Sequence, residues 1–335
     1  MHEYVTGGGL AGEALPPSWA AEGGAMRRAL AEDFAALPGV GVVMTLDDRL
    51  PDEPGPWETI RVGPGRERET FARLAAGSSA TALIAPETGG ILADRARIIE
   101  GVGGRSLGSA PAAIDLAGDK FAMAAHWQSA GVPTPACRRV VPALGLPRDA
   151  PYPAVLKPAD GAGACETFFL PGPDSLPTEA RAMASALLQP FVAGTPLSAS
   201  FLNGAEGVGL VGVAHQRIER VDQSFQYRGG TVPAGPDVPL VEVLRALRMV
   251  QGLRGWVGVD LIWDGETRRL TVLEINPRLT TSYVGFRALL PVGSLARWWL
   301  SAMDGEFPRG ESLVRCIRAI TPLTFAADGR ILSKG

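Results

Sequence analysis

The feature that most constrains the fold is a pair of β-patterned runs near the C-terminus, Trp256–Trp263 and Arg268–Ile275, separated by the turn sequence DGET. A short turn between two such runs predicts an antiparallel hairpin. Alternation with a period of two places one set of polar side chains on a common face of this hairpin and its apolar neighbours on the other. The polar set is Asp260, Glu274 and Asn276. The register of the two strands stays open at this stage.

The chemistry of this polar face points to a divalent cation. Two carboxylates and an amide oxygen are hard ligands that suit Mg²⁺, which takes few protein ligands and completes its shell with substrate phosphates. Asp260 alone could be an ordinary solvent-facing acid. Glu274 lies inside the apolar run VLEI, where a carboxylate needs a metal or a cation as its partner. Arg278, just beyond, can clamp a phosphate or a carboxylate through two parallel hydrogen bonds.

The choice of basic residues singles out two positions. Among the 32 cations, lysine occurs only at Lys120, Lys157 and Lys334, and arginine does not replace a compact ammonium where that geometry is required. Asp119 is predicted to cap a helix that runs to about residue 130. Lys120 then lies in the first turn, where a cation opposes the helix dipole by roughly 0.3–1 kcal/mol. Lys157 ends a β-patterned run, 154–157, that leads into the glycine-rich loop 158–164. Both lysines are therefore candidate functional residues.

The first hundred residues predict a small parallel α/β unit, because strand patterns alternate with helical ones. The predicted strands are 2–6, 40–46 and 80–85, and the predicted helices are 25–37 and 91–101. Loops that follow the strands form the ligand edge of such a unit, which places Gly7–Gly9 and Glu87–Gly90 there. We predict three domains: an N-terminal domain over 1–108, a domain with a glycine-rich lid over 109–188, and a metal-site domain over 189–335.

Composition excludes several classes of protein. With 46% hydrophobic residues, 20% charged residues and a mean hydropathy of +0.11, the 335-residue chain has the apolar content of a folded protein. A net charge of −3 without a basic tract argues against a nucleic acid or a membrane as partner. Three widely spaced cysteines favour neither disulfides nor a zinc site. No export or membrane-spanning signal is visible, so a cytoplasmic location is expected.

In their order and spacing, these features resemble the ATP-grasp superfamily. The resemblance covers residues 110–293 and is carried by Lys120, Lys157 with its glycine-rich loop, LQPFV at 188–192, GVD at 258–260 and LEINPR at 273–278. It implies an α/β and α+β architecture in which two α+β subdomains clasp ATP and a small parallel α/β domain precedes them. It also implies a ligase that joins a carboxylate to an amine through an acyl-phosphate.

The resemblance assigns a role to each motif. Lys120 and Lys157 would contact the ATP phosphates, beneath a lid that contains Gly161 and Gly163. The adenine hinge would consist of Gln189, Pro190, Phe191 and Val192. The ligands of Mg²⁺ or Mn²⁺ would be Asp260, Glu274 and Asn276. The predicted catalytic residues are Arg278 and Lys157, which would stabilise the transferred phosphate.

Two positions depart from patterns found in the family. Pro196 stands where many members have a ribose-binding Glu, so ribose recognition is left open. Gly258 stands where D-alanine–D-alanine ligases have an Arg, which argues against that pair of substrates.

Further motifs are most similar to ligases of the tyramine–glutamate type, which serve the synthesis of methanofuran-like cofactors. These motifs are HEY at 2–4, PE at 86–87, YRGG at 227–230 and NPRLTTSY at 276–283. The similarity implies that the γ-carboxylate of glutamate is activated and that tyramine or tyrosine attacks as the amine. The substrate residues would be Glu87, Gly230, Thr280, Thr281 and Ser282. Small carboxylates and amines are the expected partners, and a homodimer is left open.

Two other functions remain as alternatives. A non-catalytic nucleotide-binding regulator could use the same fold, although it would be expected to lose part of the motif set. Gly7, Gly9 and Gly12 match the GxGxxG pattern of NAD-dependent oxidoreductases, but that pattern needs a helix to begin at once, and two prolines follow at 16–17. Amine-dependent ADP formation separates the ligase from the regulator. Stabilisation by Mg-ATP or by a nicotinamide nucleotide separates the ligase from the oxidoreductase.

Overall fold

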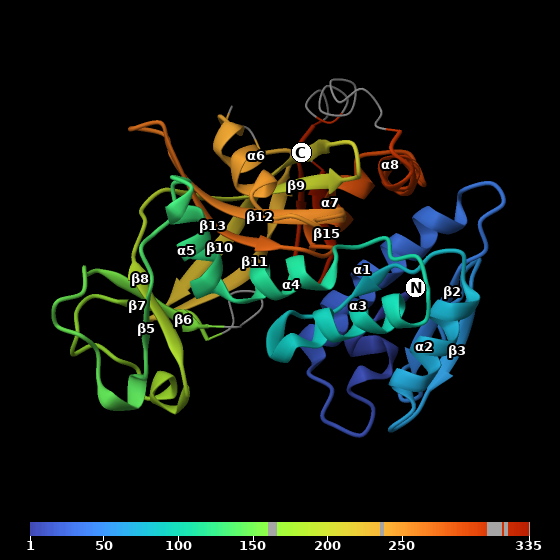
Figure 1. Cartoon of the computed structure of the whole chain (residues 1–335), viewed down its shortest axis with the longest axis horizontal. Helices are drawn as coiled ribbons and strands as arrows, with labels where there is room; N and C mark the ends of the chain where they lie inside the picture. The colour runs from blue at the N-terminus through green and yellow to red at the C-terminus, as the bar shows by residue number, and fades with distance from the viewer. Residues whose placement is uncertain (160–165, 235–237, 307–316, 318–320, 335) are drawn as a thin grey trace.

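The computed structural model of the chain describes residues 1–159, 166–234, 238–306, 317 and 321–334. The N-terminal hundred residues (blue to cyan) lie at one end of the molecule, and residues 138–159 and 166–190 (green) lie at the other (Figure 1). The long strands of the C-terminal part lie between these two ends. Within the described residues, no helix combines the length and the apolar character needed to cross a bilayer.

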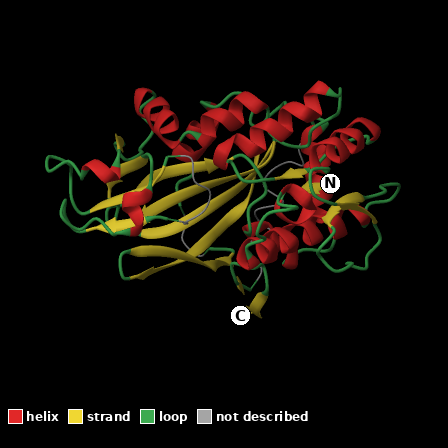
Figure 2. Ribbon diagram, turned by 90° about the horizontal axis from the view of Figure 1, so that it is seen from below, coloured by secondary structure: helices red, strands yellow, loops and turns green. Residues whose placement is uncertain are grey.

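A sheet in which eleven strands pair antiparallel forms the central and distal parts of the molecule. Its main path runs β13-β12-β9-β10-β11-β7-β6-β8-β5, and β14 and β15 extend from β11. The strands are β5 (Arg138–Val140), β6 (Ala154–Pro158), β7 (Phe168–Leu170), β8 (Ala186–Pro190), β9 (Thr195–Asn203), β10 (Val208–Val221), β11 (Ser224–Val232), β12 (Gly255–Asp264), β13 (Arg269–Asn276), β14 (Leu323–Phe325) and β15 (Ile331–Lys334). Helices run along one side of the long strands (Figure 2).

Two groups of strands are only weakly joined within this sheet. Strands β5 to β8 meet the group from β9 to β13 through one residue pair, Ser224 of β11 and Phe168 of β7. This near-separation is the arrangement expected of two subdomains. The predicted boundary at residue 188 falls inside β8, and the three domain boundaries remain predictions.

Two small parallel sheets build the N-terminal region. Strand β1 (His2–Glu3) pairs with β4 (Leu83–Ile84), and β2 (Val43–Asp47) pairs with β3 (Glu58–Val62). The helices around them are α1 (Pro17–Ala35), α2 (Glu67–Gly77) and α3 (Ile91–Gly101). The prediction of a small parallel α/β unit is confirmed, and α3 has the predicted bounds.

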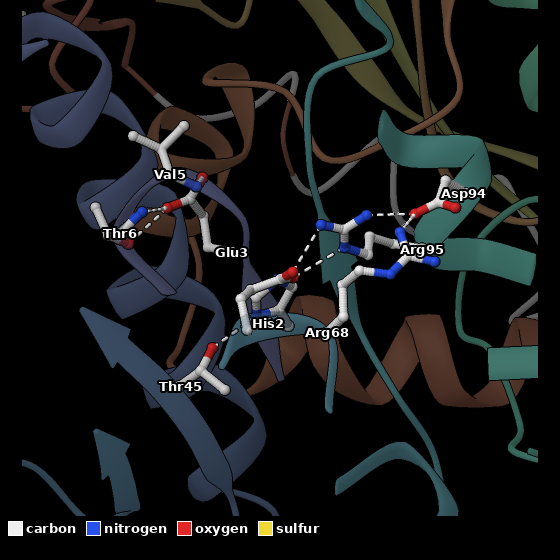
Figure 3. A network of polar contacts seen from close by, with 9 residues as sticks. His2, Glu3, Val5, Thr6, Thr45, Arg68, Asp94 and Arg95 are labelled. Carbon is white, nitrogen blue, oxygen red and sulfur yellow. Dashed lines mark hydrogen bonds and ion pairs between the residues drawn. The ribbon is translucent and has the colours of Figure 1, made fainter. Parts of the chain in front are cut away.

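Four predicted elements of this region were wrong in their bounds. The strands predicted over 40–46 and 80–85 are shorter, Val43–Asp47 and Leu83–Ile84. The strand predicted over 2–6 ends at Glu3, because the Glu3 carboxylate accepts hydrogen bonds from the backbone N–H groups of Val5 (3.1 Å) and Thr6 (2.7 Å). These bonds cap a short helical turn, Val5–Gly9 (Figure 3). The helix predicted to begin near residue 25 begins at Pro17, the first helical position, where a missing N–H costs nothing.

The junction between the N-terminal region and the sheet is a pair of helices, α4 (Pro111–Gly118) and α5 (Lys120–Ser129). Asp119 caps α5 as predicted, since its Oδ1 accepts hydrogen bonds from the N–H groups of Phe121 and Ala122, both at 3.0 Å. The backbone N–H of Lys120 donates to the carbonyl of Ala159, 3.3 Å away, just after β6. The helix start is thereby tied to the strand that carries Lys157.

The predicted hairpin is β12 and β13, and its register contains an irregularity that simple alternation does not predict. Asp260 lies opposite Glu274, whereas the next residue, Leu261, lies opposite Val272. Leu273 is therefore the extra residue of a β-bulge. The bulge lets both Val272 and Ile275 enter the apolar core while Glu274 keeps the face that it shares with Asp260.

The N-terminal helix α1 packs against helices from the far end of the chain, α7 (Ser282–Ala288) and α8 (Ser294–Met303). The contact includes a buried polar anchor: Asp33 accepts hydrogen bonds from the hydroxyl of Tyr283 (2.6 Å) and from Nε of Arg287 (3.1 Å). The remaining helix, α6 (Val241–Arg248), covers the core beneath β12 and β13. Residues of α1 are thus held beside the segment that follows β13.

Candidate active site

The three predicted metal ligands lie together on β12 and β13. Nδ2 of Asn276 donates to Oδ2 of Asp260 at 3.1 Å, and Nε2 of Gln216, on β10, donates to Oδ1 at 3.0 Å. Burial, followed by repulsion from Glu274, raises the pKa of Asp260 to about 6. Within the described residues, Asp260 forms no ion pair. This carboxylate is therefore short of positive charge.

Both predicted lysines converge on the neighbouring acid. Nζ of Lys120 lies 2.7 Å from Oε2 of Glu274, and Nζ of Lys157 lies 3.8 Å from the same oxygen. Burial alone would raise the pKa of Glu274, but the two ammonium groups lower it to about 2. The pKa of Lys157 is lowered by burial, an effect that the charge of Lys120 reinforces and that of Glu274 opposes. One carboxylate thus faces two cations, an excess that a phosphate could neutralise.

The predicted clamp, Arg278, is held by an acid from the N-terminal region. Its Nε donates to Oε2 of Glu87 at 3.0 Å, and its Nη1 donates to the carbonyl of Leu279 at 3.2 Å. The second oxygen of Glu87, Oε1, is buried and has no hydrogen-bond partner among the described residues. This pair places a fixed guanidinium beside the lysines and the metal face, since the charge of Arg278 also contributes to the low pKa of Glu274.

The predicted adenine hinge begins at the end of β8, the strand that pairs with β6, on which Lys157 lies. Gln189 and Pro190 end β8, and the N–H of Phe191 donates to the carbonyl of Pro153 at 2.9 Å. The ring of Phe191 packs edge-to-face on Phe169, with 5.1 Å between centroids, and is 38% exposed. Val192 follows Phe191 and is half-buried. The lid residues Gly161 and Gly163 lie outside the described residues.

The predicted substrate residues occupy two kinds of position. The hydroxyls of Thr280 and Ser282 form a hydrogen bond with each other (2.8 Å). Thr280 also accepts a hydrogen bond from the indole of Trp256 (3.1 Å), and Ser282 forms one with the hydroxyl of Ser200 (3.0 Å). Both residues therefore brace the loop after β13. Thr281 instead donates to Glu22 of α1. Gly230 lies on β11 opposite Gln216, where a Cβ would lie 2.6 Å from the backbone carbonyl oxygen of His215. Their roles toward a substrate remain predictions.

Residues that sequence reasoning missed are Gln216 and Glu22. Gln216 lies within the longest strand, β10, and nothing in its local pattern marks it as a partner of Asp260. Glu22 is one of several acids on or near α1, and its contact, Thr281, is 259 positions away. Neither residue carries a local sequence signal.

The glycine motif at 7–12 has a packing explanation. A Cβ at Gly9 would lie 2.4 Å from the ring of Tyr4, and one at Gly8, where φ is +101°, would lie 2.4 Å from Val62. The next long helix begins only at Pro17. The N-terminus of a long helix, which a pyrophosphate needs, is therefore missing at this turn.

The donor set fits Mg²⁺. Among the residues that the structure describes, no group of three or more His, Cys, Asp or Glu is arranged as a metal site. The face instead offers two opposed carboxylates and one amide, which suits an ion that takes few protein ligands and relies on phosphates for the rest. The low positive charge around Asp260 agrees with this fit.

Comparison with known proteins agrees with this arrangement. The family model for the ATP-grasp domain matches residues 117–282, and the model for the pre ATP-grasp 3 domain matches residues 40–114. The chain belongs to the ATP-grasp superfamily. Its ATP-grasp fold, with a preceding pre-ATP-grasp domain, confirms the predicted fold class.

Among ATP-grasp relatives, a tyramine–L-glutamate ligase of Methanocaldococcus fervens is 31% identical over 207 residues, which is 61% of this chain and 60% of the relative. The chain thus matches less than two thirds of that relative. An ATP-grasp superfamily protein of Archaeoglobus fulgidus has a TM-score of 0.66 at 23% identity, over 97% of this chain and 90% of its own. An L-amino acid ligase of Bacillus licheniformis has a TM-score of 0.68 at 17% identity, over 88% and 75%.

Proposed function

We propose that this protein is an ATP- and Mg²⁺-dependent ligase that joins a carboxylate to an amine through an acyl-phosphate. The observation that carries the proposal is the convergence of Lys120, Lys157, Glu274 and Asp260 beside the Arg278–Glu87 pair. Membership of the ATP-grasp superfamily and similarity to two named ligases support it.

The first step brings two anions together. A carboxylate oxygen attacks the γ-phosphorus of ATP, the bond to the bridging oxygen breaks, and ADP leaves. Bound Mg²⁺, which Asp260, Glu274 and Asn276 would hold, supplies charge neutralisation for the phosphates. Lys157 and Lys120 offset the remaining charge, because one acid cannot neutralise both ammonium groups.

The second step replaces phosphate by the amine. The amine nitrogen attacks the acyl carbon, the carbon–oxygen bond to phosphate breaks, and the nitrogen loses a proton as the amide forms. Arg278 is oriented by Glu87 and would hold the phosphate oxygens through the attack and the departure. Residues Gly161 and Gly163, as a lid, would exclude water from the acyl-phosphate.

For the substrates, we propose glutamate, activated at its γ-carboxylate, and tyramine or tyrosine as the amine. The support is the tyramine–L-glutamate ligase of M. fervens, together with the segment 276–283 that contains the predicted substrate residues Thr280, Thr281 and Ser282. Glu87 and Gly230 complete the proposed pocket. The hinge residues Gln189, Pro190, Phe191 and Val192 would contact the adenine.

The test is a coupled ADP-release screen that combines amino acids with amines in the presence of Mg-ATP, with mass spectrometry of the products. We expect ADP and an amide to form only when both substrates are present. Binding of Mg-ATP without ADP release under any combination would favour the non-catalytic regulator. Stabilisation by nicotinamide nucleotides, but not by Mg-ATP, would favour the oxidoreductase.

A further inference from the structure

Glu22 projects from α1 toward the segment that follows the metal face. It accepts a hydrogen bond from the hydroxyl of Thr281, which lies three residues beyond Arg278. The docking of α1 on α7, through Tyr283 and Asp33, fixes this approach. An acid of the N-terminal region therefore reaches the active site at a second point, separate from Glu87.

Among the described residues, this carboxylate has no cationic partner, a property that it shares with Asp260 of the candidate site. The neighbouring acids are satisfied by direct contacts: Glu87 by Arg278, Glu274 by Lys120, Asp33 by Arg287 and Glu3 by backbone N–H groups. Within the described residues, Glu22 forms no ion pair, and it is only partly accessible to solvent. A largely desolvated carboxylate with one hydroxyl donor is under-compensated.

The electrostatics of Glu22 agree with this geometry. Burial raises its pKa, and neither the hydrogen bond from Thr281 nor the charge of Arg278 cancels that effect, to which the charge of Glu3 adds. A cation placed beside Glu22 would relieve the cost of its burial.

A third oxygen donor joins the group. Tyr227, on β11, lies near Thr281, and burial raises the pKa of its phenol, as do the charges of Glu22 and Asp260. Tyr227 thus lies within electrostatic reach of both the metal face and Glu22. The carboxylate, the hydroxyl of Thr281 and the phenol together offer oxygen acceptors to a group with several N–H donors.

We propose that Glu22, with Thr281 and Tyr227, binds the primary ammonium group of a substrate. Arg278 would bind the phosphate oxygens of the reacting group, and Glu22 would bind the ammonium group. The ammonium has two sources under the proposed function, on which this inference rests. It is either the α-ammonium of the amino acid that is activated or the amine that attacks.

The test compares Glu22→Gln with the wild type in the presence of Mg²⁺ and a non-hydrolysable ATP analogue. Calorimetry measures binding of two probe pairs that differ only by the amino group: glutamate against glutarate, and tyramine against 4-ethylphenol. The glutamine amide oxygen can still accept the bond from Thr281, so the variant retains the docking contact. Glu22→Asp retains the charge, and Glu13→Gln, an exposed acid before α1, is the matched control.

We expect the wild type to bind the aminated member of one pair at least about 10-fold more tightly, since hydrogen bonds to a charged group are the stronger ones. Glu22→Gln should lose that preference while its affinity for the nucleotide and the deaminated probe stays unchanged. Glu22→Asp should retain part of the preference, and Glu13→Gln all of it. The pair that shows the preference identifies the source of the ammonium.

Equal affinity for both members of each pair in the wild type, or no binding of any probe, overturns the inference. Retention of the full preference in Glu22→Gln overturns it as well. The proposed function fails by a different result, namely the absence of ADP release from wild-type protein with every amino acid and amine. If the wild type prefers the aminated probe but releases no ADP, the proposed role of Glu22 in ammonium binding is supported and the proposed ligase activity is contradicted.

Discussion

Two buried polar clusters among the described residues handle charge in opposite ways. In the N-terminal region, the carboxylate of Glu67 lies 2.9 Å from Nε2 of His2 and 2.6 Å from Nη2 of Arg95. Arg95 also pairs with Asp94 (Figure 3). We call these four residues the N-terminal cluster. Each of its charges has an opposite charge in contact, and its function is to hold β1, α2 and α3 together.

At the candidate active site, by contrast, the charged groups are not paired one to one. Two ammonium groups share Glu274, while Asp260 lies beside a second carboxylate and, in the part of the chain that the structure describes, forms no ion pair. The pKa of Glu67 is lowered to about 2, because His2 and Arg95 outweigh the opposing effect of burial, whereas that of Asp260 is raised to about 6. The contrast teaches that matched buried charge stabilises the fold, whereas unmatched buried charge marks where a ligand completes the site.

The largest expected effect on the free energy of unfolding follows from a substitution that breaks the N-terminal cluster. Arg95→Met leaves Glu67 without its guanidinium partner, and losing one member of a buried ion pair costs roughly 3–5 kcal/mol of unfolding free energy. Denaturant titration measures the change, with Arg73→Met, an exposed position on α2, as the control. A loss no greater than that of the control would show that the cluster does not stabilise the fold.

A comparable effect, on activity, is expected at the candidate active site. Arg278→Ala removes the group proposed to stabilise the transferred phosphate, so ADP release should fall roughly 100- to 1,000-fold. Because buried Glu87 loses its ion-pair partner, the melting temperature should also fall, so turnover is measured at a temperature at which the variant is folded. Arg297→Ala, an exposed position on α8, is the control. Undiminished turnover in Arg278→Ala would refute the assignment.

The pH dependence of stability should sharpen the contrast. The folded pKa of Glu67, about 2, lies below its unfolded value, so its contribution is present above about pH 4.5 and disappears as the pH falls toward 2. Glu67→Gln should therefore lose roughly 1.5–3 kcal/mol at pH 7 and much less near pH 3. Denaturant titrations at both pH values test this, with Glu69→Gln as an exposed control on α2. An equal loss at the two pH values would contradict the charge argument.

The smallest effect on stability is expected at Lys157, although its effect on nucleotide binding is large. Lys157→Met removes an ammonium whose charge is not fully matched, so the free protein should be as stable as the wild type, or more stable by about 1 kcal/mol. The stabilisation by Mg-ATP should be lost at the same time. Thermal unfolding with and without Mg-ATP measures both. A destabilisation like that of Arg95→Met would erase the difference between the two clusters.

The sequence predicted the part of the site that depends on local patterns. Asp260, Glu274 and Asn276 share a face because strands alternate, and Lys120 follows a capping Asp119, as the structure confirms. The bulge at Leu273 was not predictable, because it depends on which residues of β12 lie opposite β13. Glu22 was not predictable either, since tertiary packing alone brings it to Thr281. Likewise, the early end of β1 follows from how Glu3 folds back on its own backbone.

We propose that a carboxylate attacks the γ-phosphate of ATP at the candidate active site, and the transfer of an oxygen isotope follows this step. The wild-type protein would be given Mg-ATP, an amine and a carboxylate labelled with ¹⁸O in both oxygens, and the phosphate released would be examined by mass spectrometry. An acyl-phosphate leaves one carboxylate oxygen with the phosphate when the amine attacks, so we expect one ¹⁸O atom in each phosphate. Amide formation with unlabelled phosphate would contradict the account.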